Sequence, residues 1–132
     1  CFPIRALPDV SKLAAGAAGA AASGLARVCP RPGSLAVRGL GDVCMGDRKI
    51  LGSSFYLKRR VGLYQASLIV LDFRDEVSRY LRHPSREPDY RAGRPHSEFI
   101  TSLEQEGGPT DFRLLGDIFR ESYREWMREF MV

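Results

Sequence analysis

Hydrophobic and polar positions follow three different patterns along this chain of 132 residues. Residues 9–27 form an alanine-rich run with strong helix propensity, and Asp9 can cap its first turn. Residues 35–71 carry short apolar runs separated by turn residues, which predicts strands. Residues 110–131 repeat apolar side chains on one helical stripe opposite a charged face, which predicts a helix that packs on the core.

The strand region predicts an antiparallel meander of three strands. The first strand ends at the turn formed by Gly46 and Asp47, the second covers residues 49–57, and the third covers the apolar run 61–71. We expect this third strand to be central in the sheet, with one or both faces buried. Residues 1–7 can form the end of a further strand.

A short helix and a long loop are predicted after the strands. Asp72 can cap the helix, and Pro84 ends it. Its inward-facing positions are expected to be Val77, Tyr80 and Leu81. Residues 84–98 form a polar loop that is too long for a passive connector. The whole chain, residues 1–132, is therefore expected to be one α+β domain with an antiparallel or mixed sheet flanked by helices.

Composition narrows the possible classes of protein. A net charge of +4 fits a solvated arginine-rich surface, or a basic face that binds an acidic protein or a phosphate-bearing ligand. No aromatic residues interleave with a basic cluster, so nucleic-acid binding is not expected. The three cysteines follow no C-x-x-C spacing, which favours a reducing cytoplasm, and with only two histidines present a zinc site built from Cys and His is not expected. Residues 13–26 are too short and too weakly apolar to span a membrane, so we expect a soluble protein.

The most informative segment is 41–54, with the sequence GDVCMGDRKILGSS. It predicts a strand, a tight turn and a second strand, with Lys49 near the start of the second strand. Gly52, Ser53 and Ser54 follow within five positions. A lysine in this place can hold a negatively charged reacting group, and a glycine lets that group approach the backbone closely.

This segment resembles the GRK-x-x-GS element of the lipoate-protein ligases, a branch of the biotin and lipoate ligase family. Residues 64–68 (YQASL) fall where that family usually has H-H-G-T-L. Residues 87–103 resemble the family's EPDYR…R-x-H-x-D-F-V-T-N-L stretch. The resemblance covers roughly residues 8–130 and is best from 41 to 103. The lysine element alone is moderately specific, and its order with the loop and the closing helix makes a chance resemblance improbable.

The resemblance implies an enzyme that activates lipoate or octanoate with ATP, in the presence of Mg²⁺, as an acyl-adenylate. It then implies transfer of the acyl group to a lysine of a lipoyl-acceptor domain. Both the carboxylate and the α-phosphate are negative, so a lysine aimed at them offsets their repulsion. By resemblance Lys49 is that catalytic cation. Its point charge does not demand a planar partner.

The resemblance also implies roles for other residues. Asp42 takes the position of the family's ND aspartate and could bind Mg²⁺, orient a ligand amine, or only face the turn. Gly52 and Ser53 would present backbone N–H groups to the ligand, beside Ser54. The remaining candidates for substrate or nucleotide binding are Gln65, Ala66, Arg91 and Arg94. The two arginines could contact phosphate or the acceptor domain, or could bond carbonyls of their own loop. Cys44 is interpreted as a small core side chain, with nucleophilic acyl transfer as its alternative.

Two departures from the family pattern shape the functional prediction. The glycine-rich motif RR-x-x-GGG-x-V-x-H-D is absent, and Gln65 and Ala66 replace the usual histidine and glycine. We therefore expect a fold that lacks the family's N-terminal part, and a chain that is inactive alone. The missing loop would come from an upstream segment or a separate chain, and exposed strands would favour self-association. The alternatives are a non-catalytic family member that binds an acyl group or an acceptor protein, and a basic adaptor for an acidic partner.

Overall fold

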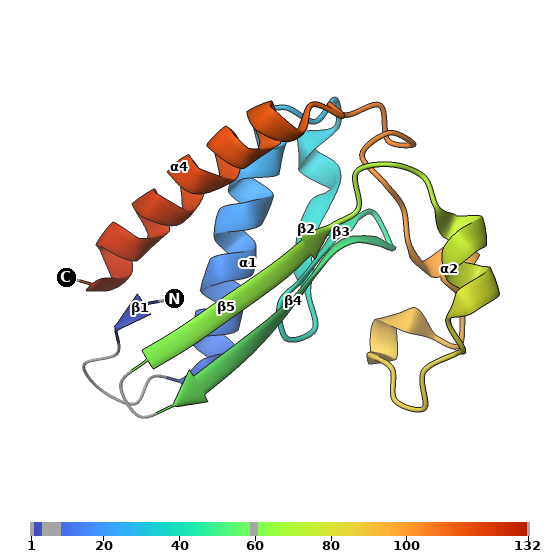
Figure 1. Cartoon of the computed structure of the whole chain (residues 1–132), viewed down its shortest axis with the longest axis horizontal. Coiled ribbons are helices and arrows are strands. Elements are labelled where there is room, and N and C mark those ends of the chain that lie inside the picture. The colour runs from blue at the N-terminus through green and yellow to red at the C-terminus, as the bar shows by residue number, and fades with distance from the viewer. Residues whose placement is uncertain (1, 4–8, 59–60, 132) are drawn as a thin grey trace.

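The computed structural model describes residues 2–3, 9–58 and 61–131, and the side chains of 9–58 and 61–128. Its fold is α+β, with an antiparallel sheet and flanking helices (Figure 1). The sheet order is β1-β5-β4-β3-β2. The strands are β1 Phe2–Pro3, β2 Leu35–Arg38, β3 Asp42–Met45, β4 Arg48–Lys58 and β5 Val61–Leu68. The α-helices are α1 Val10–Ala26, α2 Arg74–Tyr80, α3 His96–Phe99 and α4 Phe112–Met131, and short 3-10 turns form at Pro32–Ser34 and Asp89–Arg91.

The helix predicted over residues 9–27 is confirmed as α1. The Asp9 carboxylate caps it by accepting hydrogen bonds from the backbone N–H groups of Ser11 and Lys12. Its small side chains bring α1 close to α4: a Cβ atom on Gly24 would lie 2.7 Å from the Ser122 hydroxyl oxygen. The alanine-rich run is therefore a packing surface and not a linker.

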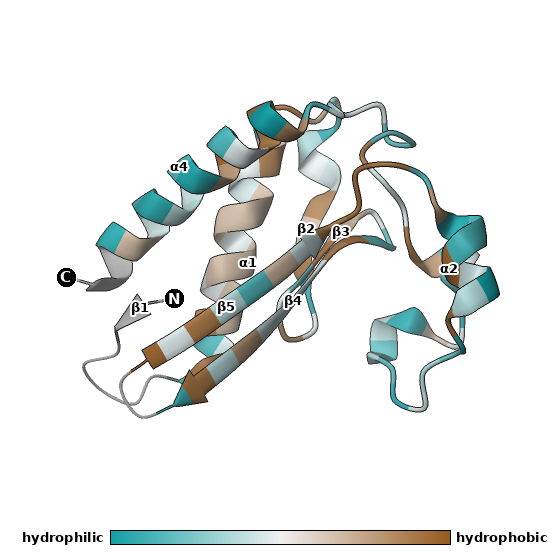
Figure 2. Cartoon of the chain, viewed as in Figure 1, coloured by the Kyte–Doolittle hydropathy of each residue, from teal (hydrophilic) through white to brown (hydrophobic). Residues whose placement is uncertain are grey.

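The closing helix is also confirmed, and it begins where the Asp111 carboxylate accepts N–H groups of Arg113 and Leu114. Leu115 and Ile118 are buried against the core. The predicted apolar stripe is less buried than expected elsewhere: Leu114 at its start is exposed, and four later positions are only half-buried, namely Phe119, Tyr123, Trp126 and Met127. The predicted stripe positions Phe130 and Met131 lie outside the described side chains. Figure 2 shows the hydrophilic residues of α4 on its outer side.

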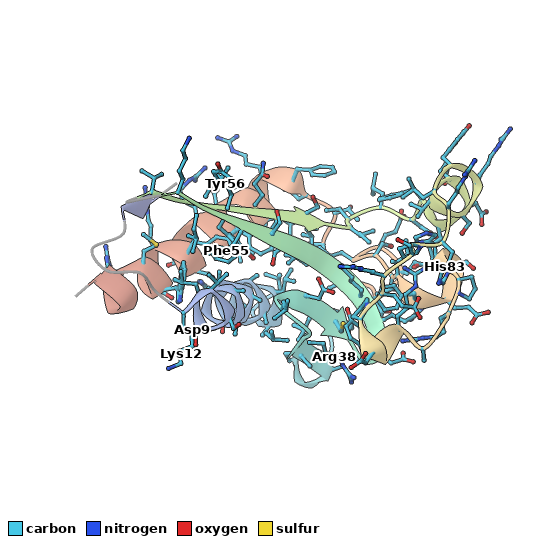
Figure 3. The ribbon with its side chains drawn as sticks, turned by 90° about the horizontal axis from the view of Figure 1, so that it is seen from below. Asp9, Lys12, Arg38, Phe55, Tyr56 and His83 are labelled. Carbon is cyan, nitrogen blue, oxygen red and sulfur yellow. The ribbon has the colours of Figure 1, made fainter. Side chains whose placement is uncertain are left out.

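The hydrophobic core lies between the sheet and these two helices. α1 packs on β2, β3 and β4, and α4 packs on α1. The largest fully buried side chains include those of Leu13, Leu25, Val43, Ile50, Leu51 and Leu103. Figure 3 shows neighbouring strand residues pointing to opposite sides, with Phe55 toward the helices and Tyr56 away from them. The sheet thus has one helix-covered face and one open face.

The predicted three-strand meander is wrong in two respects. The first predicted strand is divided into β2 and β3, because Gly39 and Gly41 adopt positive φ angles and reverse the chain. The third predicted strand is not central. β5 ends at Leu68, and among the described residues its neighbour beyond β4 is the two-residue β1. Val61 and Leu63 are exposed because they point to the face of the sheet that the helices do not cover. Of predicted residues 1–7, the described pair Phe2–Pro3 does form a strand.

The predicted burial of the short helix is also wrong. In α2, Tyr80 is 72% exposed, and Leu81, just past the helix end, is 57% exposed; Val77 is only half-buried. The reason is position: α2 lies beyond the end of the sheet, where it packs on α3 and not on the core (Figure 1). Asp72 accepts the Arg74 N–H as expected, although Phe73 occupies the capping position.

The segment after α3 returns to the sheet. Ile100 forms a parallel bridge with Lys49, and the Thr101 N–H donates to the Lys49 carbonyl at 2.9 Å. The predicted loop over 84–98 therefore contains a short helix and a 3-10 turn, and its end is fixed to β4. Within the described part of the chain, every helix is too short or too polar to cross a lipid bilayer.

Candidate functional site

A β-bulge in β4 places the predicted lysine and glycine on one face. Cys44 of β3 pairs with Lys49, and Val43 pairs with Leu51, so Ile50 is an extra residue. Ile50 and Leu51 are both fully buried on the helix-covered side. In a regular strand, residues three apart point to opposite faces. The bulge changes this alternation, so Lys49 and Gly52 lie on the same face although they are three residues apart. This explains the K-x-x-G spacing.

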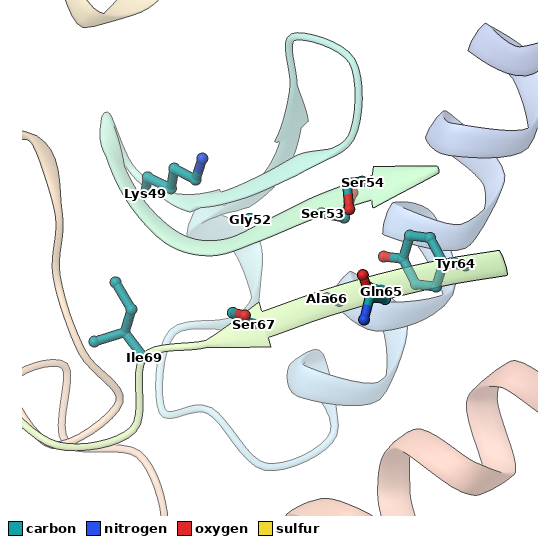
Figure 4. Close-up of a pocket in the computed structure, with 9 residues that line it drawn as sticks. All are labelled: Lys49, Gly52, Ser53, Ser54, Tyr64, Gln65, Ala66, Ser67 and Ile69. Carbon is teal, nitrogen blue, oxygen red and sulfur yellow. The ribbon is translucent and has the colours of Figure 1, made fainter. Parts of the chain in front are cut away.

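Lys49 lies across the backbone of Gly52 on the open face (Figure 4). A Cβ atom on Gly52 would be 2.8 Å from Lys49 Cε and 2.9 Å from Nζ, so the absent side chain makes room for the lysine. The ammonium forms an ion pair with Asp42 Oδ1 at 2.9 Å. The Lys49 side chain is 27% exposed.

Asp42 is held from both sides. Its second oxygen, Oδ2, accepts a hydrogen bond from the Tyr90 hydroxyl at 2.7 Å. Burial, and then this hydrogen bond, raise the pKa of Tyr90 well above its ordinary value, so the hydroxyl stays a donor. With Oδ1 bound to Lys49 and Oδ2 bound to Tyr90, Asp42 is poorly placed to ligate Mg²⁺. Among the described residues no group of three acidic, cysteine or histidine side chains could hold a metal ion. The residues present do not fit a protein-held Mg²⁺.

A cavity of about 790 Å³ lies along β4 and β5, and Lys49 is one of the residues that line it. It contains six of the predicted site residues: Lys49, Gly52, Ser53, Ser54, Gln65 and Ala66. Tyr64, Ser67 and Ile69 also line it, and the predicted set of site residues did not include them. Ser67 alternates with Gln65 in β5 and shares its face of the sheet. Ile69 continues this period of two just past the end of the strand, and the period was the signal that could have identified both residues.

Ser53 contributes to this cavity in a different way from its neighbours. Its hydroxyl donates to the Gly41 carbonyl oxygen at 2.7 Å. A Cβ atom on Gly41 would lie 2.7 Å from the Ser53 hydroxyl oxygen, so this contact needs a glycine. Ser53 therefore ties β4 to the turn before β3, while the neighbouring Gly52 and Ser54 lie on the opposite face of the strand.

Arg91 and Arg94 do not line the cavity. Arg91 is buried, its Nε donates to the Arg94 carbonyl at 3.0 Å, and its guanidinium lies over the Phe99 ring. Arg94 donates to the carboxylate and the backbone carbonyl of Asp47, both at 2.9 Å. This geometry matches the structural alternative, in which the arginines hold their own loop and fasten it to the turn between β3 and β4.

The described cysteines offer no reactive thiolate. Cys44 is fully buried, and burial is the main reason that its pKa is raised. Burial likewise raises the pKa of Cys29. A neutral, inaccessible thiol is a poor nucleophile. Cys44 is a core side chain, as the sequence interpretation favoured.

Comparisons with known proteins add no relative. No protein-family model matches the chain. No curated protein matches it. No solved structure matches it either. The family resemblance therefore depends on the motifs in the sequence alone.

Proposed function

We propose that this chain is the acyl-nucleotide-binding part of a lipoate-protein-ligase-like acyltransferase, with a biotin and lipoate ligase-like fold. The observation that supports this proposal is that Lys49 lines one cavity together with other residues of the resembling motifs. A cation beside small polar residues and open backbone is suited to a ligand with a negative centre and an extended chain.

The proposed reaction has two steps. A carboxylate oxygen of lipoate or octanoate attacks the α-phosphorus of ATP, the bond to the bridging oxygen of the β-phosphate breaks, and pyrophosphate leaves. The amine of an acceptor lysine then attacks the acyl carbon, loses a proton, and displaces AMP. Lys49 reduces the repulsion between carboxylate and phosphate in the first step, and it stabilises the AMP anion in the second.

Asp42 has a supporting role in this proposal. It pairs with one N–H of the Lys49 ammonium, and an ammonium group has three. Two N–H bonds are left for the ligand. Mg²⁺ commonly binds through phosphates and water, so it would enter with the nucleotide and not through Asp42.

The proposal includes a second component. The glycine-rich, doubly basic loop of the family is not present in these 132 residues. We propose that an upstream segment or a separate chain supplies it, and that the chain alone binds the acyl-adenylate without turning it over. The acceptor would be a lipoyl domain protein.

A second candidate is a non-catalytic member that binds an acyl group or an acceptor protein. The observation in its favour is that Gln65 and Ala66, which replace the family's histidine and glycine, line the cavity itself. The double variant Gln65→His/Ala66→Gly separates the two candidates. A gain in acyl-adenylate affinity of tenfold or more supports the non-catalytic candidate, and unchanged or weaker affinity supports the ligase-like one.

Equilibrium titration with octanoyl-sulfamoyl-adenosine, an unreactive mimic of the acyl-adenylate, tests the proposed function. Lys49→Met should weaken binding by about 10- to 100-fold, because a charge-assisted hydrogen bond is lost. Lys58→Met, at the exposed end of the same strand, is the matched control and should bind like the parent chain. Equal affinity of the two variants, or no binding by the parent chain, would refute the proposal.

A further inference from the structure

Tyr90 occupies a fitted position on the open face of the sheet. The Arg38 guanidinium lies 5.8 Å from the centre of its ring, and the Phe99 ring centre lies 5.3 Å away. A Cβ atom on Gly39 would lie 3.6 Å from Tyr90 Cε1, so the ring also packs closely on the turn between β2 and β3. These contacts fix the direction in which the hydroxyl points.

The hydroxyl points at the residue that pairs with Lys49. Tyr90 donates to Asp42 Oδ2 at 2.7 Å, and Asp42 Oδ1 pairs with Lys49 Nζ at 2.9 Å. The three side chains come from three elements: the 3-10 turn Asp89–Arg91, β3 and β4. The Asp42 carboxylate therefore connects the closely packed Tyr90 to the flexible side chain of Lys49.

The loop that carries Tyr90 is itself fastened in place. Arg94 donates to the Tyr90 carbonyl at 3.0 Å, and it also binds Asp47 at the β3–β4 turn. The Arg91 Nε group donates to the Arg94 carbonyl. The two arginines that lie outside the cavity thus have an indirect connection to it, because they hold the turn from which Tyr90 reaches Asp42.

We infer that Tyr90 is a positioning residue for Lys49, which acts through Asp42. A lysine side chain has four rotatable carbon–carbon bonds, and ordering it upon ligand binding reduces affinity. Tyr90 fixes the carboxylate, and the carboxylate holds the ammonium at the edge of the cavity before a ligand arrives. The orientation of Lys49 stands independently of the proposed function. Only the expected effect on acyl-adenylate binding rests on the proposed function.

Nuclear magnetic resonance of the lysine ammonium groups tests the orientation directly. The chain has only three lysines, and Lys12 and Lys58 are exposed, so they serve as internal references. At mildly acidic pH the Lys49 Nζ order parameter should exceed those of Lys12 and Lys58. In Tyr90→Phe it should fall toward the reference values, because the hydroxyl that fixes Asp42 is gone.

Tyr56→Phe is the matched control, since Tyr56 lies on the same face and is exposed, and it should leave Lys49 ordered. Asp42→Asn provides a second variant and should free Lys49 as Tyr90→Phe does. Amide spectra show whether each variant is folded. A folded Tyr90→Phe protein with an unchanged Lys49 order parameter would overturn the inference, as would a parent chain in which Lys49 moves like the references.

Titration with octanoyl-sulfamoyl-adenosine gives the functional readout. Tyr90→Phe should weaken binding by about 3- to 10-fold, while Tyr56→Phe should not change it. If the parent chain does not bind this mimic but Lys49 loses order in Tyr90→Phe, the proposed function fails and the positioning role stands. If the mimic binds and Lys49 stays ordered in Tyr90→Phe, the positioning role fails and the function stands.

Discussion

The two faces of one sheet differ in almost every property. On the helix-covered face, Val43 and Leu51 are fully buried beside Leu25 of α1. On the open face, the same two strands present Asp42 and Lys49, which keep contact with solvent. The extra residue Ile50 changes the alternation of β4, so that Lys49 and Gly52 share the open face while Leu51 stays on the helix-covered face. The core contacts of β4 lie on the helix-covered face and the proposed binding residues lie on the open face, so substitutions should separate stability from the proposed binding.

The largest expected effect is on the helix-covered face. Leu51→Ala should lower the free energy of unfolding by about 3 kcal/mol, because it removes buried methyl groups and leaves a cavity. Leu114→Ala is the matched control and should change stability by less than about 1 kcal/mol, since Leu114 is 42% exposed on α4. Urea denaturation measures both. Similar losses in the two variants would contradict the assignment of Leu51 to the core.

A smaller effect is expected at the buried carboxylate of Glu106. Glu106 is buried, and its carboxylate binds Arg31, Arg48 at 2.6 Å and the Thr101 hydroxyl at 2.8 Å. Glu106→Gln keeps the shape and removes the charge, so unfolding should become easier by about 2 kcal/mol. Denaturation of Glu104→Gln, at an exposed position nearby, supplies the comparison. No loss of stability in Glu106→Gln would show that this cluster does not support the fold.

The contact between α1 and α4 gives a pair of glycine substitutions with opposite signs. A Cβ atom on Gly24 would lie 3.1 Å from Ile118 Cγ2 and closer still to Ser122, so Gly24→Ala should destabilise by about 1–2 kcal/mol. A Cβ atom on Gly19 would meet nothing within 4 Å, so Gly19→Ala should stabilise the helix by about 0.5–1 kcal/mol. The melting temperatures of the two variants measure both effects. Stabilisation by Gly24→Ala would be evidence against the close contact between α1 and α4.

The smallest effect on stability, and the most selective one on binding, is expected at Gly52. An added methyl group would displace the flexible end of Lys49 and no backbone, so Gly52→Ala should change unfolding by less than about 1 kcal/mol. It should nevertheless weaken binding of octanoyl-sulfamoyl-adenosine about 10-fold, because the ammonium moves. Gly33→Ala, with open space at its Cβ position, is the control. Normal binding by Gly52→Ala would show that Lys49 need not lie across this residue.

The long periodic elements of the fold could be predicted from the sequence. The capped alanine-rich run and the amphipathic C-terminal stripe became α1 and α4, since both patterns extend over several helical turns. The burial of single elements could not be predicted. Residues 61–71 are apolar, yet β5 lies near the sheet edge, and Tyr80 of α2 lies beyond its end. Hydrophobicity alone does not say which elements become neighbours.

The site was predictable to the extent that motif residues are close in the chain. Six motif residues line one cavity with Lys49 among them. The bulge at Ile50 could not be predicted, because it appears only in the pairing of two strands. Tyr90 also escaped the sequence prediction, although it belongs to a quoted motif. It is 48 positions from Asp42, and only the folded loop brings its hydroxyl there.

Differential acetylation of the lysines tests directly whether the Lys49 ammonium contacts an acyl-adenylate. Acetic anhydride is applied with and without octanoyl-sulfamoyl-adenosine, and mass spectrometry reads the extent of modification at each of the three lysines. We expect the mimic to protect Lys49 and to leave Lys12 and Lys58 as reactive as before. Equal modification of Lys49 in the presence of saturating mimic would contradict this expectation, since the ammonium would then not contact the ligand.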